Sequence, residues 1–238
     1  MGKEIVNYEE LLANMAVVQS TMERPSGTTI STRSGVLSYN GTPCPGNKLP
    51  AIIIASVFSN TLYEGRFDPN NLSAPICFAY SENGEDMAPH PASAKPQSET
   101  CDLCPNNQWG SDPDGGRGKA CKNGRVLALI PGDTKPDAVP TAEIALLKPP
   151  VTSIKNYQTY VQKLAAVYNR PPLGVLTEIS TVPDQKSQYK VVFTDIGVMD
   201  ISMIKPILDR VPSALDACQK VYEYTEPAPA GEAKQRKM

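Results

Sequence analysis

The sequence has few aromatic residues, a single histidine and no long apolar run. Aromatic side chains make up 6% of the 238 residues, and His90 is the one histidine. No stretch of about 18 apolar residues occurs, so we expect no membrane-spanning helix. Lys and Arg (23) nearly balance Asp and Glu (25), for a net charge of −2, which excludes a histone-like coat of positive charge. Any contact with nucleic acid must come from a local basic patch.

The N-terminus also lacks the marks of a targeting segment. It carries Glu4, Glu9 and Glu10 and no apolar core, which argues against a signal peptide. Val6 stands where an N-myristoylation signal requires Ser or Thr. We therefore expect a soluble, cytoplasmic protein, in which six cysteines do not form a disulfide scaffold.

The pattern of apolar residues predicts a mainly β (α+β) domain with a few helices. Alternation and short apolar runs indicate strands, whereas apolar residues every three or four positions indicate helices. The expected strands are Thr28–Tyr39 (one bent strand or two short ones), Leu49–Phe58, Ala74–Tyr80, Gly124–Ile130, Thr141–Leu147, Val175–Val182 and Tyr189–Ile196, the last two as a hairpin. The expected helices are Glu4–Gln19, Ser153–Tyr168 with Ser153 as its cap, and Ile201–Tyr222, broken near Pro212.

A small barrel with one helix before its last two strands is the layout of an OB-fold. We therefore predict one OB-fold-like domain over residues 1–226, with a Cys-rich insertion at about 75–123 and a disordered tail at 227–238. The alternative architecture is a generic α+β sandwich, which the same periodicities allow.

Four cysteines predict a structural zinc site in this insertion. Cys101 and Cys104 form a CxxC pair, with Cys77 upstream and Cys121 downstream. Structural zinc is held by four soft ligands in a tetrahedron, and one short loop cannot supply all four. Two thiolates on a tight turn, joined by two from flanking segments, meet this requirement and leave no open position for a catalytic water.

Other interpretations of the cluster stay open. The CxxC could serve redox chemistry, the four cysteines could hold an iron–sulfur cluster, or His90 could replace Cys77 as a zinc ligand. We do not expect an enzyme, because the His-x-Glu and Pro-Cys-x-x-Cys motifs of zinc deaminases are absent and one histidine gives little scope for nucleophilic catalysis. A metal-dependent nuclease would need carboxylate clusters that the sequence does not display.

The residues around the cysteines suit a single strand of nucleic acid. Binding such a strand requires cations for its phosphates and aromatic faces for its bases. The candidate contacts are Trp109, the basic run Arg117, Lys119, Lys122 and Arg125, the loop residues Tyr63 and Arg66, and Tyr189 and Lys190 on the predicted hairpin. The contrary interpretation is that Trp109 packs over the metal site and that the basic run is a solvated loop.

The cysteine segment resembles a signature of phage-encoded single-stranded-DNA-binding proteins. The resemblance lies in Cys101 to Ser111 (CDLCPNNQWGS), Gly118 to Lys122 (GKACK) and Pro75 to Phe78 (PICF), and extends over about residues 28–200 through the segments 149–161 and 175–180. It implies an OB-fold with a zinc-bearing insertion, similar in plan to the helix-destabilising proteins of T-even phages. Two features depart from that plan: four cysteines stand where one ligand is usually histidine, and a strongly acidic C-terminal tail is missing.

The function that the resemblance implies is non-sequence-specific coating of single-stranded DNA in phage replication, recombination or repair, in the host cytoplasm. Replication or recombination proteins would be further partners. The alternative is a zinc-knuckle adaptor that binds a host or phage protein, for example in transcription takeover, without touching DNA. Near-neutral charge and low aromatic content suit this adaptor. A salt-sensitive affinity for naked oligonucleotide separates the two.

Overall fold

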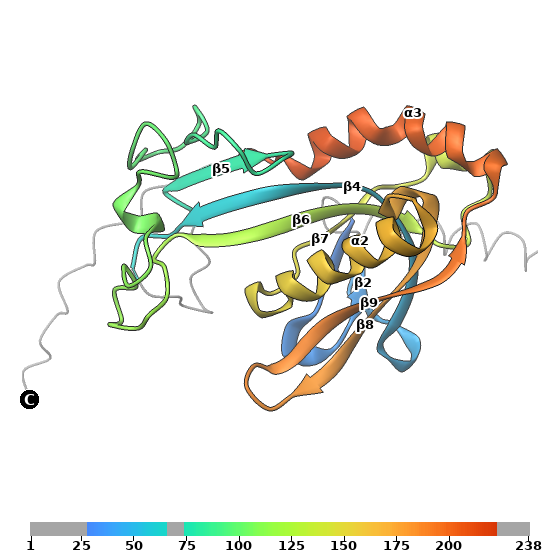
Figure 1. The fold of residues 1–238 in the computed structure, drawn as a ribbon, viewed down its shortest axis with the longest axis horizontal. Coiled ribbons are helices and arrows are strands. Elements are labelled where there is room, and N and C mark those ends of the chain that lie inside the picture. Colours follow the sequence, from blue (N-terminus) through green and yellow to red (C-terminus); the bar gives the residue numbers. More distant parts are fainter. Residues whose placement is uncertain (1–27, 66–73, 223–238) are drawn as a thin grey trace, which may run out of the picture.

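The computed structural model of the chain describes residues 28–65 and 74–222. The helix predicted at Glu4–Gln19, the tail at 227–238 and the candidate contact Arg66 lie outside these residues. The prediction of a mainly β domain is confirmed: within these residues, one sheet curls into a half-barrel and carries two α-helices (Figure 1). Neither helix combines the length and the apolar character that crossing a bilayer requires.

The strands follow the apolar segments of the sequence. They are β1 (Thr29–Ser31), β2 (Ser38–Tyr39), β3 (Thr42–Pro43), β4 (Lys48–Leu62), β5 (Cys77–Ser81), β6 (Lys122–Pro131), β7 (Ala145–Leu147), β8 (Val175–Asp184) and β9 (Gln188–Val198). Of the two possibilities for Thr28–Tyr39, the chain adopts two short strands. β4 runs past the predicted end at Phe58 as far as Leu62, because its polar last residues pair with β5 and β6.

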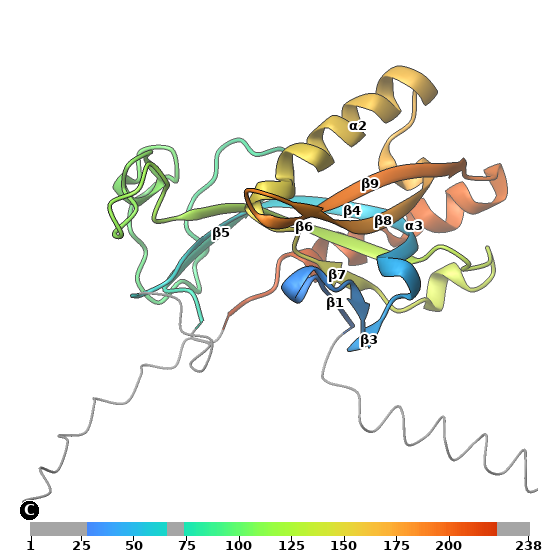
Figure 2. The same cartoon turned by 90° about the horizontal axis from the view of Figure 1, so that it is seen from below.

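The sheet has the order β3-β2-β1-β7-β6-β4-β8-β9, and β5 pairs with the far end of β4. All paired strands are antiparallel except β1 and β7. β4 and β6 pair over most of their length and form a long ribbon. One end of this ribbon enters the half-barrel beside the β8–β9 hairpin, and the other carries residues 74–121, which we call the Cys-rich lobe (Figures 1 and 2).

Apolar side chains fill both faces of the central sheet. The helix α2 (Ile154–Tyr168) covers one face and α3 (Ile201–Cys218) covers the other. Leu127 and Leu129 of β6 join the core beneath α2, whereas Val126 joins the core beneath α3. This alternation is expected of a strand that is buried on both faces, because successive side chains point to opposite faces of the sheet. Side chains at alternate positions of β6 therefore keep the same two orientations toward the lobe, whereas β4 exchanges its faces at a register shift between Ile53 and Ala55.

Two predictions about the helices are wrong in detail. Ser153 occupies the N-cap position of α2, but its side chain bonds to no helix N–H. Its Oγ instead accepts from the backbone N–H of Val191 at 2.9 Å, which ties the helix start to β9. The second helix, α3, is continuous through Pro206 and Pro212 rather than broken. Its buried face against β4 and β6 offsets the missing backbone hydrogen bonds.

Candidate cysteine site and its surroundings

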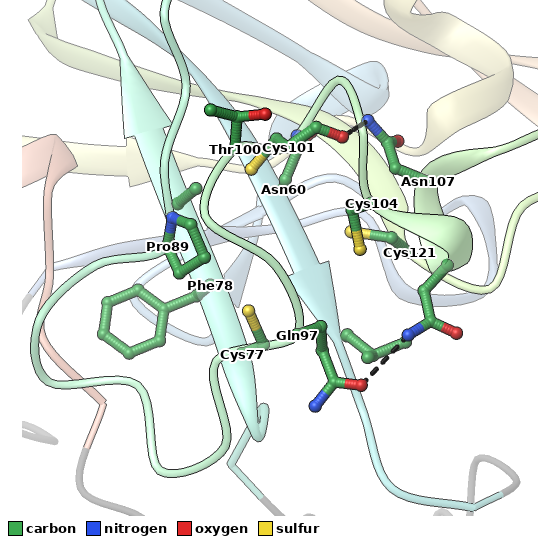
Figure 3. A pocket seen from close by; sticks show the side chains of 13 residues that line it. Asn60, Cys77, Phe78, Pro89, Gln97, Thr100, Cys101, Cys104, Asn107 and Cys121 are labelled. Carbon is green, nitrogen blue, oxygen red and sulfur yellow. Dashed lines mark hydrogen bonds between the residues drawn. The ribbon is translucent and has the colours of Figure 1, made fainter.

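The four predicted zinc ligands line one small cavity at the junction of the ribbon and the Cys-rich lobe (Figure 3). Cys77 begins β5, Cys101 and Cys104 lie on one loop, and Cys121 directly precedes β6. The remaining lining residues are Asn60, Leu62, Phe78, Ala79, Pro89, Gln97, Thr100, Asn106 and Asn107. Pairing of β5 and β6 with β4 thus brings together cysteines that are far apart in the sequence.

The four thiols are free and face a common hollow. Figure 3 shows the side chains of Cys104 and Cys121 close together, with those of Cys77 and Cys101 bordering the same hollow. Within residues 28–65 and 74–222, however, no group of three or more His, Cys, Asp or Glu side chains could hold a metal ion as it stands. Bond lengths near 2.3 Å to zinc would require these thiols to close in.

The surroundings of Cys101 and Cys121 favour the protonated form of these two thiols. Burial, and behind it the charge of the neighbouring thiols, raises the pKa of Cys121 to about 12. Burial likewise raises the pKa of Cys101, although the Asn60 side chain, hydrogen-bonded to this thiol, opposes the shift. Reactive redox cysteines need the opposite shift, since the thiolate is the nucleophile. A cation in the hollow would stabilise the thiolates that burial disfavours.

His90 does not line the cavity. Its ring stacks on Phe78, with 4.8 Å between ring centroids and an interplanar angle of 19°. Its Nδ1 accepts a hydrogen bond of 3.1 Å from the backbone N–H of Ala92. Cys77, the ligand that His90 would replace, does line the cavity. The geometry thus favours Cys77 over His90 as the fourth side chain of this site.

Three asparagines that sequence analysis missed join the cavity to the ribbon. Nδ2 of Asn123 donates to Oδ1 of Asn60 and, at 2.9 Å, to Oδ1 of Asn107. Nδ2 of Asn107 donates in turn to the carbonyl of Cys101 at 2.8 Å. The only signal in the sequence is that Asn60 and Asn123 lie in the polar ends of strands whose middle parts are apolar. Their pairing depends on the ladder between β4 and β6.

The predicted contact Trp109 is 80% exposed on the lobe, so it does not pack over the cysteine site. Nζ of Lys119 lies 5.4 Å from the centroid of the indole ring and donates to Oδ1 of Asn107 at 3.2 Å. Lys122 is paired with Asp112 at 3.4 Å. Arg117 is exposed on the same loop. The lobe therefore brings an open aromatic face and several of the predicted cations together.

Arg125 leaves the basic loop and lies on the ribbon, directly opposite Phe58 in the β4–β6 ladder. Its Cζ is 3.2 Å from the centroid of the Phe58 ring and 6.0 Å from that of Tyr157 on α2. Burial lowers the pKa of this guanidinium. Its Nε is buried without an acceptor in the described part of the chain.

The remaining predicted contacts are dispersed. The hydroxyl of Tyr189 is hydrogen-bonded to Oγ1 of Thr32 at 3.2 Å, and Lys190 pairs with Asp184 at 2.7 Å. Both hairpin side chains thus have partners within the fold. Tyr63, 44% exposed at the end of β4, has a pKa raised mainly by burial. The structure gathers the lobe residues with one another but not with the hairpin.

The described residues thus combine a cavity of four cysteines with an exposed aromatic ring and cations beside it. Asn107 contacts both features, since it bonds to Cys101 and accepts from Lys119. The chemistry of this region has to be argued from these contacts. Comparison with protein-family models, with curated proteins and with solved structures finds no significant match to this chain.

Proposed function

We propose that this protein binds single-stranded DNA without sequence specificity, through the Cys-rich lobe and the adjoining ribbon. The observation that carries the proposal is the exposed ring of Trp109 with Lys119 over it. An open indole offers a stacking face to any base, and a nearby ammonium offers a charge to the phosphate. Stacking of this kind is tolerant of sequence because every base has a π-face. Strand coating in phage replication, recombination or repair is the process that the signature around Cys101 suggests.

The order of the strands supports an OB-fold-like barrel. β4, β6 and β7, then α2, then the hairpin β8–β9 follow one another as five strands with a helix before the last two. OB-folds contact oligonucleotides with the second and third strands and with the connections between strands one and two and between strands four and five. The Cys-rich lobe belongs to the first of these connections. Its exposed residues would therefore lie at the usual edge of an OB-fold binding surface.

We propose in addition that Cys77, Cys101, Cys104 and Cys121 hold a structural Zn²⁺. The donor set fits, because four thiols from three segments line one cavity and the burial of Cys101 and Cys121 calls for a compensating cation. Bound zinc would supply a cross-link between β5, the CxxC loop and the start of β6. Trp109 and Lys119 lie between the ligands of this cross-link in the sequence, so it would fix the loop that presents them. An iron–sulfur cluster would use the same four cysteines and is distinguished by metal analysis.

The test is an anisotropy titration of fluorescent oligo-dT at two salt concentrations, with duplex of equal length as control. Tight binding of the single strand that weakens with salt is expected, because phosphate contacts release counterions. Equal affinity for duplex would contradict the stacking mechanism, and absence of binding at low salt would contradict the proposed function altogether.

A protein-binding adaptor is the second candidate, and one observation favours it. Leu103, between the two cysteines of the CxxC pair, is 80% exposed. A leucine contributes neither a phosphate contact nor an aromatic face, whereas an apolar contact with another protein would use it. Failure to bind oligo-dT together with loss of a partner on Leu103→Ala would support this alternative.

A further inference from the structure

Arg125 differs in its contacts from several other lysines and arginines of the described residues. Those cations have acceptors within the protein: Lys48, Lys122, Lys163 and Lys190 contact carboxylates, while Arg170 and Arg210 donate to backbone carbonyls. Within residues 28–65 and 74–222, the side chain of Arg125 makes neither an ion pair nor a hydrogen bond. Its contacts are with the aromatic rings of Phe58 and Tyr157.

These rings hold the guanidinium in one orientation. Arg125 and Phe58 are directly opposed in an antiparallel ladder, and Cζ is 3.2 Å from the ring centroid. Phe58 is itself confined, because a Cβ on Gly84 would lie 2.9 Å from two of its ring atoms. A planar cation stacked on a fixed ring keeps its N–H groups in a defined plane. The side chain is thus oriented before any ligand arrives.

This orientation leaves the N–H donors of Arg125 without acceptors among the described residues. Nε of Arg125 is buried and has no acceptor among the described residues. Burying a donor without an acceptor is costly, and such groups in native proteins call for an explanation. An anion bound at the terminal nitrogens of the guanidinium would counter the burial that lowers the pKa of Arg125.

Arg125 lies on the route from α2 to the lobe. On β6 it follows Asn123 by two positions, so both side chains lie on the same face of the strand. Asn123 bonds to Asn107, which accepts from Lys119 beside the ring of Trp109. Figure 2 shows β6 leading from beneath α2 to the lobe. Arg125, Asn123 and Lys119 therefore form a line from the ribbon to the proposed stacking residue.

We propose that Arg125 binds a backbone phosphate of the single strand, with the N–H groups of its terminal Nη atoms donating to two oxygens of the same phosphodiester. This inference rests on the proposed function and extends it: the strand would continue from Trp109 along β6 toward α2. In this bidentate geometry, a fixed guanidinium binds phosphate oxygens more strongly and more specifically than an ammonium group does.

Substitution of Arg125 tests the proposal by affinity. Arg125→Met keeps an apolar stem over Phe58, and Arg125→Lys keeps the charge. We expect Arg125→Met to weaken oligo-dT binding about tenfold and to lower the salt slope by about 0.7, the value for one phosphate contact on a single strand. Arg125→Lys should weaken binding while the slope stays, because the charge remains and the bidentate contact is lost. The matched control is Arg210→Lys, since Nε of Arg210 is also buried without an acceptor while its Nη2 donates to the carbonyl of Ala142.

The arginine Nε–H resonance of the wild-type protein gives a second readout that does not depend on a variant folding. The signal of Arg125, assigned with Arg125→Lys, should shift on addition of oligo-dT, and that of Arg210 should not. If oligo-dT binds while the Arg125 signal and the affinity of Arg125→Met are unchanged, this inference fails and the proposed function stands. If oligo-dT does not bind at all, the proposed function fails with it. A shift with inorganic phosphate but not with oligo-dT would overturn the strand assignment and identify a site for free phosphate.

Discussion

Asn123, on the ribbon, donates a hydrogen bond of 2.9 Å to Oδ1 of Asn107, in the Cys-rich lobe. The same Asn107 donates to the carbonyl of Cys101 and accepts from Lys119. One side chain thus contacts the ribbon, the cysteine site and the cation beside Trp109. In the proposed function, the metal site and the strand-binding residues share this support.

Replacing Asn107 should therefore disturb both sites at once. Asn107→Ala removes the acceptor of Asn123 and the donor to the Cys101 carbonyl, and we expect the free energy of unfolding to fall by about 1–3 kcal/mol. Zinc affinity should fall with it, because Cys101 loses its support. Thermal unfolding and chelator competition measure the two effects. Asn106→Ala is the matched control, since among the described residues its Nδ2 bonds to Gln97 alone, in an exposed hydrogen bond; equal effects of both variants would contradict the role of Asn107.

Loss of one cysteine should lower metal content and stability together. Cys101→Ser leaves three thiols in the cavity, and three ligands do not close a structural zinc site. We expect less zinc per chain by elemental analysis and a lower melting temperature. Cys44→Ser is the control, because Cys44 is buried in the core beneath α2 rather than in the cavity; it should lose stability but keep its zinc. Cys101→Ser with unchanged metal content and melting temperature would remove the structural-metal proposal.

Zinc affinity should rise with pH. The thiols of Cys101 and Cys121 have raised pKa values, about 12 for Cys121, so they are protonated at neutral pH in the absence of metal. Zinc binds thiolates and must displace these protons, which makes the apparent affinity increase about tenfold per pH unit for each proton released. Competition with a chelator between pH 6.5 and 8, corrected for the chelator's own protonation, measures the slope. An affinity independent of pH would show that these thiols are not the ligands.

The sequence predicts the apolar framework well, because burial on both faces leaves a local pattern. Strands such as β6 and the helix α2 coincide closely with their apolar segments. The sequence does not predict that β4 extends through its polar end, nor that Ser153 accepts a hydrogen bond from Val191. Both features depend on partners that are distant in the sequence. The same reason explains why the sequence suggests Tyr189 and Lys190 as contacts to nucleic acid. Their partners in the protein, Thr32 and Asp184, become visible only in the fold.

The candidate site was predictable in its composition but not in its arrangement. Spacing alone grouped the four cysteines that line the cavity. Spacing also grouped Arg125 with the basic loop, whereas strand periodicity turns it toward Phe58, away from that loop. The asparagines carry no local motif, so their network could be found only once β4 and β6 were paired.

Trp109 should contribute to DNA affinity but not to stability. Its ring is exposed, so Trp109→Ala should leave the melting temperature unchanged and weaken oligo-dT binding by about 1–3 kcal/mol, the contribution of one stacked base. Trp109 is the single tryptophan, so quenching of protein fluorescence by oligo-dT reports on it directly. Leu103→Ala is the matched control at equal exposure. If Leu103→Ala weakens oligo-dT binding as much as Trp109→Ala, the stacking role is wrong.

Lys119 and Lys190 should differ in their effect on salt dependence. Lys119 lies by the open indole ring and has no carboxylate partner among the described residues, whereas Lys190 is paired with Asp184 at 2.7 Å. A lysine that already has a counter-ion in the protein releases none on binding DNA, so Lys190→Ala should leave the salt slope unchanged. Lys119→Ala should lower the slope by about 0.7, the value for one phosphate contact on a single strand. Equal slopes for wild type and Lys119→Ala, with a lower slope for Lys190→Ala, would move the binding surface from the lobe to the β8–β9 hairpin.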